Sequence, residues 1–308
     1  MIVSFFSFKG GVGRTTALAA TAIQLARAGK RVVVIDFDVE SPGIGTLFHS
    51  STGGNARCGV VDYLLEKSVL QGRLEIQDYY HLCDDPKIIQ DGTEIAVVPA
   101  GVVDDMYLEK LARVNYEFLY RTAEVASGDV SPLHQLLKQL RNSCRPDFVL
   151  IDSRAGFHDL GGLSLSGLAH WHVILGLPSE QSWQGLAVAI AQLGRHRVLA
   201  GLMQRECLVV QAMGAPSGEF RERQVREFRE RSFDLFAENY FDPQQSDSSE
   251  WPVPDPESID SPHFPAVISW DSRVAGYSHL ADVADFLCEG EYRRLVATLL
   301  ERSGRSNT

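Results

Sequence analysis

The stretch that decides the fold is Lys9-Gly10-Gly11-Val12-Gly13-Arg14-Thr15-Thr16, near the start of the 308-residue chain. It follows an apolar run, Ile2 to Phe8, which predicts a buried strand, and it leads into residues 16–29, where apolar residues recur at helical spacing. Glycines let successive backbone N–H groups converge on a phosphate, and the start of the following helix adds positive potential. The Thr15 hydroxyl is of the type that ligates the magnesium of a nucleotide. The stretch therefore predicts a phosphate-binding loop.

The rest of the chain continues the alternation of strands and helices. Five more apolar runs predict strands: RVVVIDFD (31–38), EIAVVPAG (94–101), DFVLIDSRAG (147–156), HVILGLP (172–178) and CLVVQAMG (207–214). Helices are expected at 107–125, 132–141, 181–199, 219–240 and 283–302. Uniformly apolar strands that alternate with helices are typical of an α/β fold with a doubly wound, mostly parallel sheet and helices on both faces.

One stretch interrupts this pattern. Residues 241–265 are rich in proline, serine and acidic residues and show little periodicity, so we expect a long loop within a single domain of residues 1–308. A mobile, solvated insertion is the plain interpretation. Because Trp251 and Phe264 lie within it, a lid or a partner-docking segment is the alternative.

Four motifs, in chain order, resemble those of one family. The loop KGGVGRTT (9–16) is similar to the KGGxGK[ST] loop of the deviant-Walker-A P-loop ATPases, which include the ParA and MinD proteins. VVVIDFDVESPG (32–43) resembles their strand and switch segment, FVLIDSRAG (148–156) their Walker B strand, and HVILGLPSEQSWQG (172–185) the strand and helix start that follow. The resemblance covers residues 1–215 well. It implies a P-loop NTPase fold of the SIMIBI class, a KGGVGR-type subgroup, and ATP with Mg²⁺ as ligands.

Three carboxylates are expected beside the loop. Asp36 and Asp38 stand two residues apart at a strand end, so both should point to the side where the phosphate loop lies. Asp36 is a candidate for the magnesium shell together with Thr15. The resemblance implies that Asp38 positions or activates the attacking water and that Asp152 is the Walker B carboxylate, which reaches magnesium through water. The alternative is that all three are solvated turn residues at strand ends.

Lys9 matches the signature lysine of the family. In these proteins two subunits face each other across two nucleotides, and this lysine of each subunit reaches the phosphates that the other binds. The resemblance therefore implies a homodimer in the ATP state. A surface lysine at the start of a loop is the plain alternative.

Two residues of the loop depart from the common G-x-x-x-x-G-K-[ST] pattern: Phe8 stands at the first glycine and Arg14 at the lysine. A guanidinium is larger than an ammonium and planar, so the two cations are not interchangeable beside a phosphate. We expect ATP binding to survive and hydrolysis to be slow. Replacing Arg14 by lysine is then expected to retain binding and to hydrolyse at least as fast. A degenerate site is the alternative.

The base of the nucleotide is expected at the ends of the last strands. Family members read adenine with an Asn where this chain has Gln211, whose amide offers the same donor and acceptor. AVISWDSRVAG (266–276) resembles the last strand of the family and places Ser269, Trp270 and Asp271 near the base, although Trp270 is equally compatible with the core. The predicted nucleotide-binding residues are thus Gly10, Gly11, Val12, Gly13, Arg14, Thr15, Thr16 and Gln211.

Composition limits the partners. The chain has 40 Asp and Glu against 29 Lys and Arg, a formal charge of -11, which disfavours broad attraction to nucleic acid or to anionic lipid. Five widely spaced cysteines and the absence of an apolar run of membrane-spanning length favour a cytoplasmic protein. We therefore expect a homodimer that acts on an unidentified protein partner.

Two functions of different classes follow. The leading hypothesis is an ATPase that serves as a nucleotide-dependent dimer switch and positions or regulates a partner. The alternative is a module that holds ATP as a structural ligand and never hydrolyses it. Small-molecule ligases of the same fold remain open, whereas the iron proteins of this fold are excluded because DSRAGFHDLGG (152–162) lacks their cluster cysteines.

Overall fold

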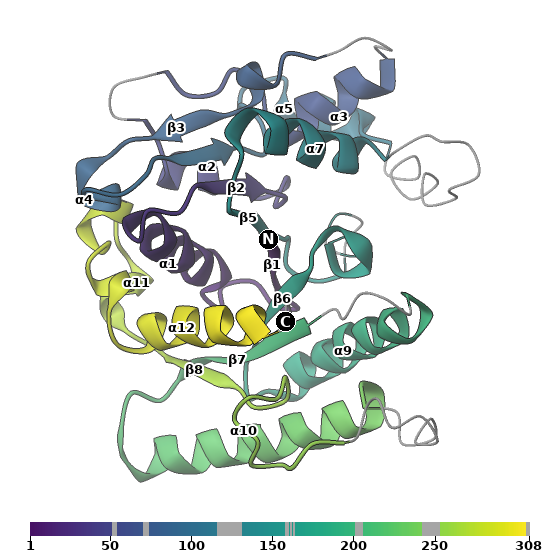
Figure 1. Ribbon diagram of the computed structural model, residues 1–308, viewed down its shortest axis with the longest axis vertical. Coiled ribbons are helices and arrows are strands. Elements are labelled where there is room, and N and C mark those ends of the chain that lie inside the picture. Colours follow the sequence, from purple (N-terminus) through teal and green to yellow (C-terminus); the bar gives the residue numbers. More distant parts are fainter. Residues whose placement is uncertain are drawn as a thin grey trace.

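The computed structural model describes residues 1–50, 54–69, 74–115, 131–157, 160, 162, 164–200, 206–241 and 253–305. One eight-stranded sheet runs through the molecule in the order β3-β4-β2-β5-β1-β6-β7-β8 (Figure 1). The strands are β1 Ile2–Ser7, β2 Val32–Asp36, β3 His81–Cys83, β4 Ile95–Val98, β5 Phe148–Asp152, β6 Trp171–Gly176, β7 Glu206–Gly214 and β8 Ala266–Ser269. Among the strands of the described residues, only β3 pairs antiparallel with its neighbour. The predicted mostly parallel sheet is confirmed.

Helices cover both faces of the sheet. They are α1 Arg14–Arg27, α2 Ile44–Leu47, α3 Val60–Val69, α4 Pro86–Ile89, α5 Tyr107–Arg113, α7 Pro132–Cys144, α9 Glu180–Ala200, α10 Gly218–Asn239, α11 Ser272–Ala275 and α12 Gly290–Arg305. Along β2, Val32 and Val34 belong to the core that holds α1 and α12, whereas Val33 and Ile35 belong to the core that holds α3 and α7. Successive strand residues thus face opposite layers, as the uniformly apolar strands predict.

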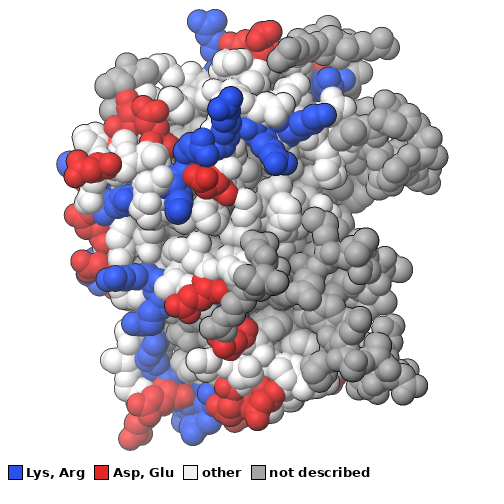
Figure 2. All heavy atoms as spheres, in the orientation of Figure 1, with Lys and Arg blue, Asp and Glu red and all other residues white. Residues whose placement is uncertain are grey.

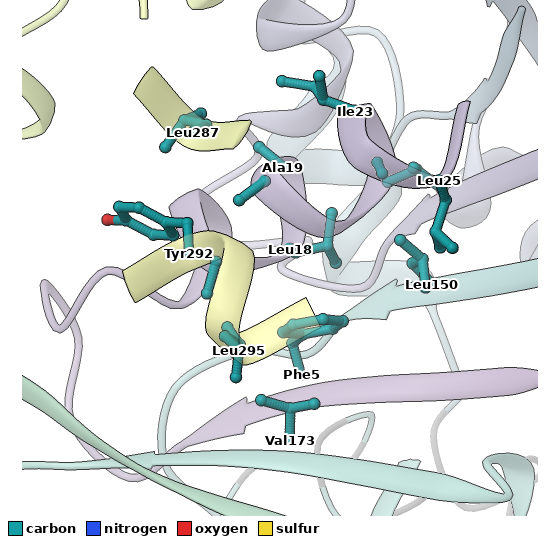
Figure 3. Packing of buried hydrophobic residues seen from close by; sticks show 14 of the residues in the cluster. Phe5, Leu18, Ala19, Ile23, Leu25, Leu150, Val173, Leu287, Tyr292 and Leu295 are labelled. Carbon is teal, nitrogen blue, oxygen red and sulfur yellow. The ribbon is translucent and has the colours of Figure 1, made fainter. Parts of the chain in front are cut away.

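Helix α1 is the best-buried helix of the layer that carries the phosphate loop. Its side chains Leu18, Ala19 and Ile23 are fully buried between the sheet and the C-terminal part of the chain. Figure 3 shows this packing, in which Leu18 and Ala19 of α1 lie near Phe5 of β1 and Leu295 of α12. Because alanines form much of its buried surface, α1 can approach the sheet closely, and the loop before it therefore has a firm base.

Several elements differ from the sequence predictions, and helices α2, α3 and α4 were not predicted at all. The helix expected over 283–302 begins only at Gly290, since the residues before it form short 3₁₀ turns. The turn at Leu280–Asp282 packs on α4, and the turn at Phe286–Cys288 packs on α1. Strand β3 was not predicted because three residues carry no usable period. Helix α5 ends at Arg113, and the remainder of the helix expected up to residue 125 lies outside the described residues from position 116 on.

Of the predicted loop at 241–265, Phe241 and residues 253–265 are described, and Trp251 lies outside the described residues. Residues 253–265 contain no helix or strand. His263 is fully buried, Arg302 of α12 donates to the Phe264 carbonyl at 3.2 Å, and the Arg229 guanidinium lies 5.4 Å from the Phe264 ring centre. The end of the loop, residues 261–265, is therefore packed on the domain, whereas most of residues 253–260 are exposed.

Candidate functional site

The carboxyl ends of β1, β2 and β5 meet at one edge of the sheet, because these parallel strands are direct neighbours. The glycine loop leaves β1 at this edge and enters α1. Gly11 and Gly13 adopt φ of +72° and +83°, a conformation that favours glycine. Added Cβ atoms at Gly10, Gly11 or Gly13 would meet nothing within 4 Å, while Val12 is buried in the core. The loop is thus anchored by one side chain and has open space in front of its glycines, which fits a phosphate cradle.

Phe8, which replaces the first glycine of the common loop pattern, has a packing role. Its ring lies 5.1 Å from the Phe157 ring, and an added Cβ at Gly185 of α9 would stand 2.1 Å from its Cγ atom. Gly185 therefore makes the room that Phe8 fills. The departure at position 8 joins the loop to α9 and leaves the glycines that follow unaffected.

Four predicted site residues form one bonded network. Nε of Arg14 donates to Oδ1 of Asp152 at 2.6 Å, and Nη2 of Arg14 donates to Oδ2 of Asp38 at 2.8 Å. The Thr15 hydroxyl donates to the other oxygen of Asp152 at 2.7 Å. Arg14 is only 8% exposed, and its charge-assisted bond to Asp152 is buried, whereas the bonds to Asp38 and from Thr15 are partly buried. The structure therefore brings together the predicted loop cation, the predicted metal-binding hydroxyl and two of the three predicted carboxylates.

Asp36 has a different environment. It is buried, and it accepts hydrogen bonds from the backbone N–H groups of Asp38 at 3.0 Å, Gly43 at 3.0 Å and Ile44 at 3.1 Å. Burial, followed by the charge of Asp152, raises the pKa of Asp36 to about 7 despite these bonds. Asp36 thus shapes the turn that carries Asp38, and its charge responds to pH near neutrality.

At Arg14 and Asp152, burial and ion pairing shift the pKa in opposite directions. Burial lowers the pKa of the Arg14 guanidinium, but Asp152 and Asp38 outweigh it and the net pKa is raised, so Arg14 is always charged. Burial also raises the pKa of Asp152, and the bonds from Arg14 and Thr15 offset part of that change. One cation therefore balances a cluster of carboxylates that water reaches poorly.

These residues fit a magnesium ion delivered with a nucleotide. Within the described ranges, no three His, Cys, Asp or Glu side chains are arranged to hold a metal by themselves. Mg²⁺ commonly keeps several waters and shares its remaining positions between one or two carboxylates and substrate phosphates. The Thr15 hydroxyl beside Asp152 supplies such a partial set of oxygen ligands.

Lys9 and Thr16 flank this network. Lys9 is partly exposed, its carbonyl oxygen accepts the Ser7 hydroxyl at 2.9 Å, and no described carboxylate lies within ion-pair distance of its ammonium group. The Thr16 side chain hydrogen-bonds Tyr277, a residue to which no sequence motif points. Tyr277 joins the loop after α11 to the start of α1.

Two further residues link the loops that carry Asp38 and Asp152. Arg154 and Glu40 form an ion pair between the segment after β5 and the segment after β2. Arg154 lies within FVLIDSRAG (148–156), the stretch that resembles the Walker B strand, but no role was predicted for it.

At the β7 and β8 end, the predicted base-site residues are less closely connected. Gln211 is fully buried, and neither its amide nitrogen nor its amide oxygen has a hydrogen-bond partner among the described residues. Ser269 is engaged by Arg221 at 2.5 Å and by Glu291 at 3.1 Å, and Asp271 caps α11 by accepting from the N–H of Arg273 at 2.9 Å. Trp270 is 51% exposed, so it is not a core residue.

Comparisons with known proteins identify the family of the chain. Residues 3–170 match the family described as the CobQ/CobB/MinD/ParA nucleotide binding domain, and the chain belongs to this family. It is 32% identical over 155 residues to the septum site-determining protein MinD of Buchnera aphidicola, covering 50% of this chain and 45% of that protein. It is 37% identical over 95 residues to the chromosome-partitioning ATPase Soj of Thermus thermophilus, covering 30% of this chain and 36% of Soj. The chain thus spans less than half the length of these relatives.

A solved structure extends the likeness of fold to nearly the whole chain. The septum site-determining protein MinD of Pyrococcus horikoshii, complexed with Mg-ADP, superposes with a TM-score of 0.55 over 98% of this chain and 95% of that one, at 17% identity. The fold is therefore that of a MinD-type P-loop NTPase. No helix in the described part of the chain is long and apolar enough to cross a membrane.

Proposed function

We propose that the chain is a slowly hydrolysing ATPase that acts as a nucleotide-dependent homodimer switch and positions or regulates a protein partner. The observation that carries the proposal is the network in which Arg14 and Thr15 bond to Asp38 and Asp152 beside an open glycine loop. Binding a nucleoside triphosphate with magnesium requires N–H donors, a cation, a hydroxyl and carboxylates at one place. All four kinds of group lie together here.

The proposed residues divide the work of hydrolysis. A water oxygen bonds to the γ-phosphorus while the bond from that phosphorus to the bridging oxygen breaks, and ADP leaves with the bonding electron pair. We assign the orientation of this water, and the acceptance of its proton, to Asp38. Arg14 stabilises phosphate charge, and Thr15, Asp36 and Asp152 would hold magnesium, which adds charge neutralisation when bound. The backbone of the loop contacts the phosphates through Gly10, Gly11, Val12, Gly13 and Thr16.

We expect turnover below the ~1 to 10³ s⁻¹ of typical enzymes. Arg14 stands where the common loop pattern has a lysine, and stronger binding of the phosphates by a guanidinium in the ground state does not raise kcat unless the transition state is bound more tightly still. Stimulation by a partner is therefore part of the proposal.

The homodimer part of the proposal rests on Lys9 and on the surface around the loop. Lys9 of each copy would reach the phosphates held by the other copy.

Exposed apolar side chains support a protein contact at the same edge of the sheet. Val103, Met106 and Leu108 follow the carboxyl end of β4, and Phe157 follows that of β5. Clusters of this kind are common where proteins meet.

A protein partner suits the charge of the surface better than nucleic acid or lipid. The formal charge is -11, and on the face shown in Figure 2 basic and acidic side chains lie interspersed. The relatives named for septum-site determination and chromosome partitioning suggest a partner in a positioning system. All five cysteines are free thiols, which suits the cytoplasm.

Replacing the Thr15 hydroxyl tests the site. Thr15→Ala should abolish magnesium-dependent ATP binding in titration calorimetry, because the hydroxyl is the expected direct ligand. Thr46→Ala, at an exposed threonine of α2, is the matched control and should bind as wild type does. Equal affinity for Thr15→Ala and wild type would show that the site is assigned wrongly.

Light scattering tests the switch. Asp38→Ala should hydrolyse slowly and accumulate as a dimer at saturating ATP, whereas adding Lys9→Ala to this variant should give a monomer that still binds ATP. An unchanged mass with and without ATP would remove the basis of the switch. The second candidate function, a structural ATP-binding module, is favoured instead if the dimer is constitutive and steady-state phosphate release stays at background.

A further inference from the structure

Arg14 makes two hydrogen bonds that a lysine could not reproduce with the same geometry. Its Nε donates to Asp152 and its Nη2 to Asp38, so both bonds leave from one edge of the planar guanidinium. Among the described residues, Nη1 donates to no acceptor, and its two N–H groups remain for another ligand. A lysine ammonium is a compact point charge without this fixed fork.

Asp38 depends on Arg14 for the orientation of its carboxylate. Its Oδ2 accepts from Arg14, whereas its Oδ1 is buried and has no hydrogen-bond partner in the described part of the chain. The Asp38 side chain is 13% exposed, so bulk water does little to orient it. Asp36 fixes only the backbone of Asp38, through its N–H group. Arg14 is thus the described side chain that aims the Asp38 carboxylate.

We propose that Arg14 is a positioning residue: Nε and Nη2 hold Asp152 and Asp38 while Nη1 contacts a phosphate of the nucleotide. The inference rests on the function proposed above and deepens it. The bridge keeps Oδ1 of Asp38 in one orientation, ready to accept a hydrogen bond from the attacking water. Arginine at this place is then an adaptation of the site, and the sequence-based expectation that a lysine here hydrolyses at least as fast is reversed.

Arg14→Lys separates positioning from phosphate binding. The variant keeps a cation near the phosphates, so its dissociation constant and KM for ATP with magnesium should stay within about threefold of wild type, while kcat falls at least about tenfold. Arg31→Lys is the matched control. It pairs with Asp147 at the opposite ends of the same two strands, β2 and β5, and should change neither parameter.

A ligand-free measurement tests the bridge itself. Urea unfolding of Arg14→Lys, Asp38→Asn and the double variant, without nucleotide, should show that the two substitutions together cost less than the sum of the single effects, because both break the same bond. Additive effects on the free energy of unfolding would show that Arg14 and Asp38 do not interact, and would overturn the proposal.

The kinetic outcomes that contradict the proposal are equally definite. A kcat for Arg14→Lys at or above the wild-type value would overturn it, as would a loss of ATP affinity large enough to account for the whole effect. If wild type releases no phosphate above the level of Thr15→Ala, the proposed function fails instead, and the ligand-free coupling then decides the bridge by itself.

Discussion

The two ends of the candidate site treat their polar side chains in opposite ways. At the carboxyl ends of β2 and β5, Arg14 is bonded to Asp38 and Asp152, so buried charges balance one another within the protein. At the end of β7, the Gln211 amide is fully buried and has no hydrogen-bond partner among the described residues.

This difference predicts which substitutions should change the stability of the protein and which should change its recognition of a ligand. Buried ions that are paired become costly when one partner is removed, because the other is left uncompensated. A buried amide without partners already carries its desolvation cost, so removing it relieves the fold. Substitutions of the ion-paired residues at the phosphate end should therefore change the free energy of unfolding strongly. A substitution of Gln211 should change ligand preference with little loss of stability.

The largest effect is expected from Arg14→Ala. It leaves the buried carboxylates of Asp38 and Asp152 without their cation and should lower the free energy of unfolding by about 3 kcal/mol or more. Urea unfolding at neutral pH without nucleotide measures this. Arg31→Ala, which breaks the exposed pair with Asp147, should cost less than about 1 kcal/mol. Equal costs for the two variants would remove the distinction between the phosphate end and an ordinary surface.

A smaller effect concerns pH. The folded-state pKa of Asp36 is about 7, above its ordinary value of 3.8, so between these values the native protein binds more protons than the unfolded chain. Stability is therefore fully present below about pH 4 and is lost as the pH rises toward 7. Between pH 5 and pH 7, the free energy of unfolding of wild type should fall by about 2 kcal/mol more than that of Asp36→Asn, whose side chain carries no charge at either pH. Parallel pH profiles of unfolding for the two proteins would show that Asp36 is ionised throughout.

The contrast between the two ends also explains what the sequence could predict. The glycine loop, the strands and the meeting of Asp38 with Asp152 follow from local period and from the rule that parallel strand ends share an edge. The bridge by Arg14 does not follow, because it depends on side-chain directions and on burial that bring residues 14, 38 and 152 together. The hydrogen bond between Thr16 and Tyr277 and the ion pair between Glu40 and Arg154 could not be predicted either, because the two residues of each pair lie far apart in the chain.

The late helix shows a different limit. Val283, Ala284 and Leu287 have an apolar spacing that suits a helix. They lie in the same core as α1, but Leu287 belongs to a 3₁₀ turn, and Val283 and Ala284 belong to the turn before it. The spacing of apolar residues indicates which residues are buried. Over so short a segment an α-helix and a series of turns can have the same spacing, so the pattern does not distinguish them. The helix begins instead at Gly290, whose φ of +54° favours glycine.

The smallest effect, and the one of opposite sign, is expected from Gln211→Leu. Leucine has a similar size and needs no hydrogen bonds, so the free energy of unfolding should stay equal or rise by about 1 kcal/mol. Gln224 is the matched control, because both amides lie near Gly214 and the Gln224 amide oxygen accepts the N–H of Ala215 at 2.9 Å. Gln224→Leu should therefore destabilise the protein by about 1 kcal/mol. If Gln211 reads the base, the Gln211→Leu protein should also lose its preference for ATP over GTP in a competition binding assay. The Gln224→Leu protein should keep that preference. A Gln211→Leu protein that is clearly destabilised and still prefers ATP would make Gln211 a structural residue, and the two ends of the site would no longer differ in kind.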